Sequence, residues 1–112
     1  MNFNSLSEIA SYIVSDGKGI LAADESNPTC AKRFDSIGVE STEDNRRDYR
    51  ELLFRSEGMK GNIGGVILFD ETIRQTAADG TSLVELITSQ GSLPGIKAVS
   101  YTHLTLPNSE LV

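Results

Sequence analysis

The chain has 112 residues and a formal net charge of −6, and hydrophobic residues make up 38% of it. This length suits one small domain or part of a larger one, and the apolar content is too high for a disordered chain. The acidic balance argues against a nucleic-acid partner. No apolar run reaches the roughly 20 residues of a membrane-spanning helix, and the N-terminus has no basic leader, so we expect neither a membrane segment nor a secretory signal.

Cysteine and histidine are scarce, with Cys30 and His103 as the single examples. Because one cysteine cannot close an intrachain disulfide, we expect a reducing, cytoplasmic setting. The chain has no CxxC or HExxH motif, and one histidine cannot build a histidine-based metal site alone. We therefore predict no metal ligands among these residues.

The first predicted elements are a helix and a strand. In residues 5–16 apolar side chains recur at helical spacing, and Ser5 with Glu8 has the spacing of a capping box. Gly17 is a suitable end for this helix. Residues 19–23, GILAA, are a short apolar run, which is typical of a strand buried on both faces in a parallel sheet.

Two further helices are predicted before the next strand. Asn27 predicts an N-cap, with Pro28 in the first helical turn and the end of the helix near Gly38. A longer helix follows over residues 43–57, where the charges EDNRRDYRE are interpreted as a solvated face. The buried side of that helix is predicted to hold Tyr49, Leu52, Leu53 and Phe54.

The rest of the chain continues the alternation of strands and helices. Residues 64–69, GGVILF, and residues 93–97, LPGIK, predict two more strands, and Ser82 with Glu85 predicts a capped helix between them. The inward residues of that helix are predicted to be Leu83, Leu86 and Ile87. Short apolar strands that alternate with helices predict an α/β fold with a parallel sheet.

Each predicted strand ends in charged residues, namely Asp24, then Asp70 with Glu71, then Lys97. In (β/α)8 barrels and in doubly wound sheets, ligands bind at the carboxyl ends of the strands. These four residues are therefore candidates for a site. The alternative is that polar residues mark where a strand leaves the core, and that acids cap the next helix.

The turn after Asp24 carries more specific signals. Short polar side chains surround the predicted start of the next helix: Ser26, Asn27 and Thr29. A helix N-terminus favours an anion, and Lys32 and Arg33 lie on the first turns of that helix, which indicates a phosphorylated ligand. The alternative is structural, with Asp24 and Glu25 forming ion pairs with Lys32 and Arg33.

The chain contains six sequence blocks whose order and spacing are characteristic of one protein family: GKGILAADES (17–26), AKR (31–33), SIG (36–38), NRRDYRELL (45–53), GGVILFDET (64–72) and GIK (95–97). From about Leu6 to Lys97 the chain resembles class I fructose-1,6-bisphosphate aldolase. The resemblance implies a (β/α)8 TIM barrel, of which this chain holds the N-terminal part with about three strands. It implies reversible cleavage of fructose 1,6-bisphosphate to dihydroxyacetone phosphate and glyceraldehyde 3-phosphate through a lysine Schiff base, without a metal or other cofactor.

The resemblance also assigns roles to single residues. It implies that Asp24 contacts the reacting substrate hydroxyls and assists proton transfer, and that Lys97 holds substrate oxygens. It places four residues near one substrate phosphate: Ser26, Thr29, Lys32 and Arg33. Threonine stands at position 29 where animal members have serine, and Asn27 and Pro28 replace their Thr-Gly. It further implies that the full-length parent is a homo-oligomer.

The resemblance stops at Ala98. We predict residues 1–97 to be the aldolase-like portion and residues 98–112 to be a non-homologous tail, which resembles translated read-through of sequencing adapters; a frameshift or splice variant is the alternative. His103 is then not expected to be catalytic. The family's Schiff-base lysine, its main acid/base glutamate and a further lysine have no counterpart here, so we predict that this chain alone is inactive. The alternative functions are a non-catalytic binding module and another phosphate-binding barrel enzyme.

Overall fold

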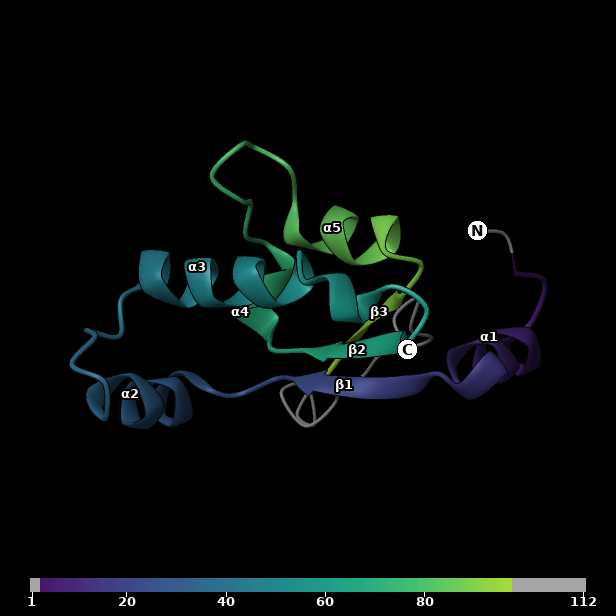
Figure 1. Ribbon diagram of the computed structural model, residues 1–112, viewed down its shortest axis with the longest axis horizontal. Coiled ribbons are helices and arrows are strands. Elements are labelled where there is room, and N and C mark those ends of the chain that lie inside the picture. Colours follow the sequence, from purple (N-terminus) through teal and green to yellow (C-terminus); the bar gives the residue numbers. More distant parts are fainter. Residues whose placement is uncertain (1–2, 98–112) are drawn as a thin grey trace, which may run out of the picture.

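The computed structural model of the protein describes residues 3–97. In chain order the elements are α1 (Leu6–Ile13), a 3-10 turn (Ser15–Gly17), β1 (Gly19–Ala23), α2 (Asn27–Asp35), α3 (Glu43–Phe54), a second 3-10 turn (Glu57–Met59), β2 (Ile63–Leu68), α4 (Asp70–Ile73), α5 (Leu83–Ser89) and β3 (Leu93–Ile96). The strands form one parallel sheet in the order β1-β2-β3, with α3 and α5 on one side of it (Figure 1). The predicted α/β fold with three parallel strands is confirmed.

Short polar side chains cap the starts of two helices as predicted. Ser5 Oγ accepts a hydrogen bond from Glu8 N at 3.2 Å, and Ser82 Oγ accepts one from Glu85 N at 3.0 Å. Each bond pairs one of the N–H groups that the first turn of a helix leaves free. The predicted N-cap at Asn27 was wrong by one residue. The N-cap is Ser26, because its carbonyl accepts the first helical bond, from Cys30 N at 2.9 Å.

The sheet face toward α3 and α5, which we call the outer face, carries the hydrophobic core. Its apolar side chains at 1% exposure or less include Ala23, Phe54, Val66, Leu68, Leu83 and Ile87. The three inward residues predicted for α5 are all buried. Burial of this kind contributes most of the stability of such a fold, at roughly 25 cal/mol per Å² of apolar surface.

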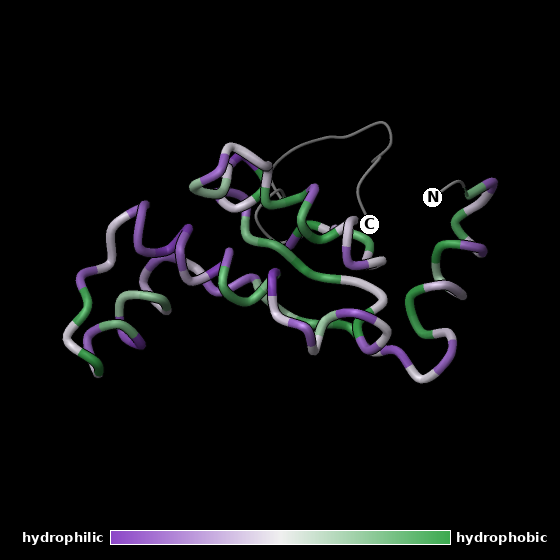
Figure 2. The backbone as a smooth tube through the Cα atoms, turned by 45° about the horizontal axis from the view of Figure 1, so that its top comes forward, coloured by the Kyte–Doolittle hydropathy of each residue, from purple (hydrophilic) through white to green (hydrophobic). Residues whose placement is uncertain are grey.

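The buried side of α3 differs from the prediction. Phe54 is fully buried, but Leu52 is 75% exposed, and the fully buried neighbour of Phe54 is Arg50, at 0% exposure. Residues four apart lie on the same face of a helix, so Arg50 shares the inward face with Phe54. The residues of α3 are largely hydrophilic (Figure 2), although the helix lies against one side of the sheet (Figure 1).

The opposite face of the sheet, the inner face, is open. Ile20 of β1 pairs with Gly65 of β2, and Ala22 pairs with Ile67. Because side chains alternate along a strand, these residues share one face. Ile20 is 54% exposed. The prediction that β1 is buried on both faces was therefore wrong, because no layer covers the inner face within the described part of the chain.

Helix α1 packs at the amino end of β2. Its predicted start is confirmed, but it ends at Ile13 and a 3-10 turn follows. A Cβ atom on Gly64 would lie 1.9 Å from the carbonyl oxygen of Ile13, so only glycine allows this approach. Leu6, in the apolar stripe of the helix, is 78% exposed. No helix among residues 3–97 has the length and apolarity to cross a membrane.

Candidate functional site

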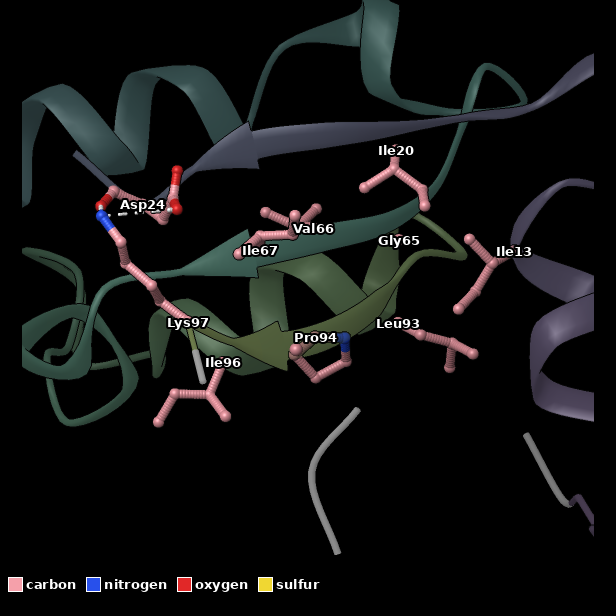
Figure 3. Close-up of a pocket in the computed structure, with 11 residues that line it drawn as sticks. Ile13, Ile20, Asp24, Gly65, Val66, Ile67, Leu93, Pro94, Ile96 and Lys97 are labelled. Atoms are coloured by element: carbon pink, nitrogen blue, oxygen red, sulfur yellow. Dashed lines mark hydrogen bonds and ion pairs between the residues drawn. The ribbon is translucent and has the colours of Figure 1, made fainter. Parts of the chain in front are cut away.

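Asp24 and Lys97 meet at the carboxyl edge of the sheet. Ala23 pairs with Leu68 and Leu68 with Ile96, so the residues that follow β1 and β3 stand at the same level. Lys97 Nζ lies 3.7 Å from Asp24 Oδ2 and 3.5 Å from the Asp24 carbonyl oxygen (Figure 3). Two of the strand-end residues named as site candidates, Asp24 and Lys97, therefore lie side by side. Both side chains remain partly exposed, at 26% for Asp24 and 34% for Lys97, and so can reach a ligand.

An apolar groove of about 460 Å³ runs along the inner face and ends at this ion pair. Its lining includes Ile13, Ile20, Ile67, Leu93, Pro94 and Ile96, and Figure 3 shows Asp24 and Lys97 at one end of the row. A carboxylate and an ammonium at the end of an apolar groove can hold the hydroxyl and carbonyl oxygens of a ligand.

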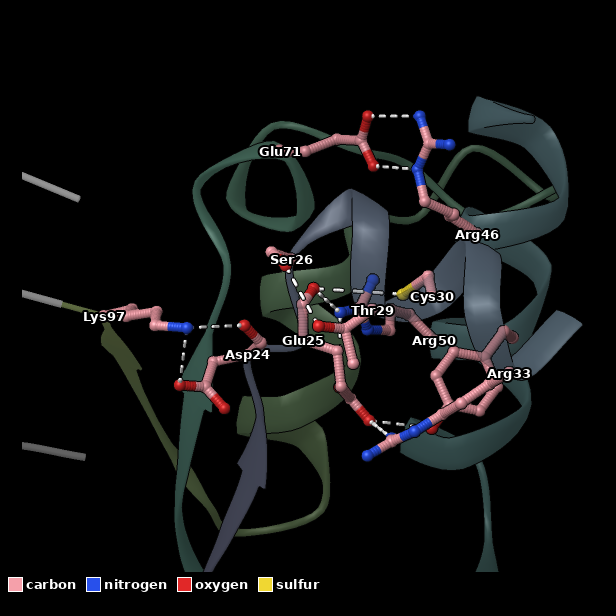
Figure 4. Close-up of polar contacts among 11 residues, drawn as sticks. Asp24, Glu25, Ser26, Thr29, Cys30, Arg33, Arg46, Arg50, Glu71 and Lys97 are labelled. Carbon is pink, nitrogen blue, oxygen red and sulfur yellow. Dashed lines mark hydrogen bonds and ion pairs between the residues drawn. The ribbon is translucent and has the colours of Figure 1, made fainter. Parts of the chain in front are cut away.

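Glu25 lies on the other side of Asp24 and faces α2 and α3. Its carboxylate forms an ion pair with Arg33 Nη1, accepts a hydrogen bond from the Tyr49 hydroxyl at 3.1 Å, and lies 3.3 Å from Arg50 Nη2 (Figure 4). Burial raises the pKa of Glu25, but its backbone N–H, Tyr49 and the positive Arg50 and Arg33 outweigh burial and hold that pKa below the ordinary value. Glu25 is therefore an anchored anion.

The residues predicted to bind phosphate surround the start of α2. The Ser26 and Thr29 hydroxyls are 3.1 Å apart and half-buried, while Lys32 and Arg33 are exposed one turn further along. Of the ion pairs considered as the structural alternative, Glu25 with Arg33 is present. Asp24 instead pairs with Lys97, and Lys32 has no ion-pair partner within residues 3–97.

Arg46 and Arg50 are site-supporting residues that sequence reasoning missed. Arg46 holds Glu71 through two hydrogen bonds, of 2.8 Å and 2.9 Å, and Arg50 Nη2 donates to the Glu25 carbonyl oxygen at 2.9 Å. The interpretation of this charge run as solvated was wrong for both. Their spacing of four residues, which puts them on one face of α3, was the available signal.

Arg46 also explains the behaviour of Glu71, the acid that follows β2. The hydrogen bonds from Arg46 lower the pKa of Glu71, and burial opposes this only in part. Asp70 forms an ion pair with Arg74, the residue that follows α4. Both acids at this strand end therefore take structural partners. No group of three or more potential ligand side chains gathers at a metal-binding spacing in the described residues.

A comparison with protein families identifies the chain. The family model described as "Glycolytic: Fructose-bisphosphate aldolase class-I" matches residues 5–111. The chain belongs to the class I fructose-bisphosphate aldolase family. The match runs past Lys97; residues 98–112 and His103 lie outside the described residues, so the origin of this segment stays a prediction.

Curated relatives agree with this aldolase assignment. The chain is 57% identical over 95 residues to the fructose-bisphosphate aldolase of Drosophila melanogaster, a match that covers 84% of this chain and 26% of that protein. It is 52% identical over 97 residues to a probable fructose-bisphosphate aldolase class 1 of Xanthomonas axonopodis pv. citri, covering 87% of this chain and 29% of the relative. The chain thus spans under a third of the length of these relatives.

The fold agrees as well. The aldolase from Plasmodium falciparum, solved in complex with TRAP and a small-molecule inhibitor, superposes with a TM-score of 0.80 at 47% identity. The match covers 83% of this chain and 27% of that one. The three parallel strands with their helices therefore correspond to part of an aldolase barrel.

Proposed function

We propose that this chain is the N-terminal portion of an enzyme that reversibly cleaves fructose 1,6-bisphosphate to dihydroxyacetone phosphate and glyceraldehyde 3-phosphate. The observation that carries the proposal is the Asp24–Lys97 pair, with 3.7 Å between Nζ and Oδ2, at the carboxyl edge of the parallel sheet. This is the edge at which barrel enzymes place their chemistry. Family membership supplies the substrate.

The proposed roles follow from the charges of the two side chains. Cleavage of the bond between C3 and C4 requires removal of the proton from the C4 hydroxyl. Asp24 is a carboxylate that can accept a hydrogen bond from a substrate hydroxyl and assist this proton transfer. Lys97 is a cation that can hold substrate oxygens and offset the negative charge of a bisphosphate. The electron pair of the broken bond passes to an iminium on a lysine that lies outside this chain.

Four residues at the start of α2 form the proposed phosphate contacts: Ser26, Thr29, Lys32 and Arg33. The hydroxyls of Ser26 and Thr29 lie close together near the helix N-terminus, where free N–H groups favour an anion. Lys32 and Arg33 are exposed and positively charged. Arg33 keeps this role in the proposal although it pairs with Glu25, because a guanidinium has five donors.

The first experiment is to sequence the source gene beyond codon 97 and to express the complete enzyme. We expect cleavage of fructose 1,6-bisphosphate that persists in EDTA and covalent trapping of dihydroxyacetone phosphate on a lysine by borohydride. Lys97→Met should lower kcat/KM at least about 100-fold, the usual cost of losing a group that stabilises charge at a reacting centre. Lys60→Met is the matched control, because Lys60 is an exposed lysine in a turn and is distant from Lys97 along the chain.

The same experiment separates the alternatives. We expect the 112-residue chain alone to show no cleavage, because it lacks the Schiff-base lysine of the proposed mechanism. Absence of activity in the complete protein, with binding of aldolase subunits retained, would favour the non-catalytic binding module. The proposal includes a cytoplasmic location, supported by the unpaired thiol of Cys30, and a homo-oligomeric parent.

A further inference from the structure

Glu25 occupies a position between the two parts of the proposed site. It follows Asp24 directly in the chain, and its carboxylate pairs with Arg33 on α2. The side chain of Glu25 is only 12% exposed, whereas that of Arg33 is 59% exposed. The carboxylate is thus fixed inside the protein and the guanidinium extends from it into solvent.

Two residues of α3 hold this carboxylate from the protein side. The Tyr49 hydroxyl donates to Glu25 Oε2 at 3.1 Å, and Arg50 Nη2 lies 3.3 Å from Oε1. Arg50 Nη2 also donates to the backbone carbonyl of Glu25 at 2.9 Å. The anchoring therefore fixes both the side chain and the backbone of the residue next to Asp24.

Glu25 is the ion-pair partner of Arg50 within residues 3–97. Arg50 is 0% exposed, and its Nε and Nη1 are buried without a hydrogen-bond partner in that part of the chain. A buried guanidinium without its counter-charge is strongly unfavourable, so Arg50 keeps the carboxylate in place whether or not Arg33 is engaged elsewhere.

Arg33 touches Glu25 through one nitrogen, Nη1. A guanidinium carries five N–H donors in a rigid fork, so one carboxylate contact leaves other donors for an acceptor in solvent. Figure 4 shows Arg33 reaching across to Glu25 from α2, with the hydroxyls of Ser26 and Thr29 one turn earlier, at the start of the helix. A guanidinium fixed at one corner can bind a phosphate with little loss of side-chain entropy.

We propose that Glu25 is a positioning residue that fixes Arg33 for binding of a substrate phosphate, with Tyr49 and Arg50 as its anchors. This inference rests on the proposed function, in which Arg33 contacts phosphate. Glu25 does not touch the substrate. It orients the guanidinium, and its removal leaves Arg33 as a flexible cation that must be ordered at each binding event.

A double-mutant cycle in the complete enzyme tests this assignment. We expect Glu25→Gln to raise KM for fructose 1,6-bisphosphate and to weaken binding of inorganic phosphate, each about tenfold, with kcat changed less than about threefold. Arg33→Ala should have a similar effect. The double variant should bind phosphate no more weakly than Arg33→Ala, within about twofold, because Glu25 acts through Arg33.

Two further variants make the test specific. Tyr49→Phe removes one anchor without changing charge, and we expect a rise of about threefold in KM. It also covers the case in which Glu25→Gln fails to fold. Glu51→Gln is the matched control: Glu51 is similarly buried at 19% side-chain exposure and pairs with Arg55 at 2.9 Å, but lies away from the strand ends. KM should stay unchanged.

The outcomes separate this inference from the proposed function. Additive effects of the two substitutions, or tighter phosphate binding in Glu25→Gln, overturn the positioning role, the second because it makes Glu25 a competitor of phosphate. A complete protein that binds phosphate with the expected cycle but cleaves no sugar overturns the proposed function and leaves the positioning role standing. A protein that binds no phosphate overturns the positioning role, whatever its activity.

Discussion

The two faces of the sheet differ in whether other elements cover them. On the outer face, helices α3 and α5 bury Leu68 and Val66 to 1% exposure or less. On the inner face, Ile20 is 54% exposed and apolar side chains line an open groove. The outer face therefore carries the packing that stabilises the described fold, whereas the inner face carries the charged pair at its carboxyl edge.

This difference shows that the residues that stabilise the fold and the residues that can contact a ligand lie on opposite faces of the sheet. Alternation along one strand sends neighbouring residues to opposite faces, so Ile67 and Leu68 belong to different environments although they are adjacent. Asp24 and Ala23 are divided in the same way, the first at the groove and the second in the core. Substitutions at Ile67 and at Leu68 should thus have different effects on stability and on contacts with a ligand.

The largest expected effect is on the free energy of unfolding, when two neighbouring residues of β2 are replaced in turn. Leu68→Ala should lower the free energy of unfolding by about 3 kcal/mol, since it leaves a cavity in the core. Ile67→Ala, at a half-buried side chain on the open inner face, should cost about 1 kcal/mol or less. Urea denaturation of both variants measures the difference. Equal losses would show that the inner face is covered in solution.

The second effect concerns the close approach of α1 to β2. Gly64→Ala places a methyl group against the Ile13 carbonyl and should cost about 2 kcal/mol through forced displacement of the helix. Hydrogen exchange should show loss of protection in α1 and retained protection in α5. Gly19→Ala, where a Cβ would meet nothing within 4 Å, is the control. Unchanged protection in α1 would contradict the docking.

The third effect concerns the pH dependence of stability and involves Glu71, at the end of β2. The pKa of Glu71 is lowered from its ordinary value of 4.5, mainly by hydrogen bonds from Arg46. A lowered native pKa means that the unfolded chain binds the proton more readily, so this stabilisation is complete above about pH 5.5 and is lost as pH falls through the native pKa.

We therefore expect Glu71→Gln to lower the free energy of unfolding by about 1 kcal/mol at neutral pH and to flatten its acid dependence. Arg46→Met should flatten it similarly. Urea midpoints measured from pH 3 to pH 7 provide the test. An acid slope that is unchanged in both variants would show that this ion pair contributes nothing to the pH dependence.

The smallest effect is confined to an exposed loop remote from both faces. Hydrogen bonds from the Thr81 backbone and from Arg55 lower the pKa of Asp79 to about 2. Arg55→Ala should raise this pKa toward its ordinary value of 3.8 with no measurable change in ligand binding. Carboxyl chemical shifts in an NMR titration measure it. A change in phosphate affinity would instead place this loop in the site.

Local signals predicted much of this structure. Ser5 and Ser82 mark helix starts because a cap depends on residues three positions apart, and GILAA matches β1 residue for residue. Asp24 and Lys97 could each be predicted as site candidates because both follow apolar strands, and parallel strands share one carboxyl edge.

The predictions of burial were wrong where contacts between residues far apart in the sequence determine which side chains are covered. Leu52 is exposed and Arg50 buried because Arg50 has its partner Glu25 25 residues earlier, a pairing that no local pattern encodes. The exposure of Ile20 depends on what covers the inner face, which the apolarity of β1 does not specify. The proposed substrate rests on the family resemblance, because no contact within the described residues identifies it.

The separation of Asp24 from Lys97 along the chain has a kinetic consequence. The two residues are 73 positions apart, and β1 and β3 each pair with β2, not with each other. Contacts of such high sequence separation carry a large loop-closure entropy and form late in folding. During synthesis the aspartate leaves the ribosome long before its lysine, so the two charges meet only after both crossovers have closed. The contact between Asp24 and Lys97 therefore cannot form in any shorter intermediate.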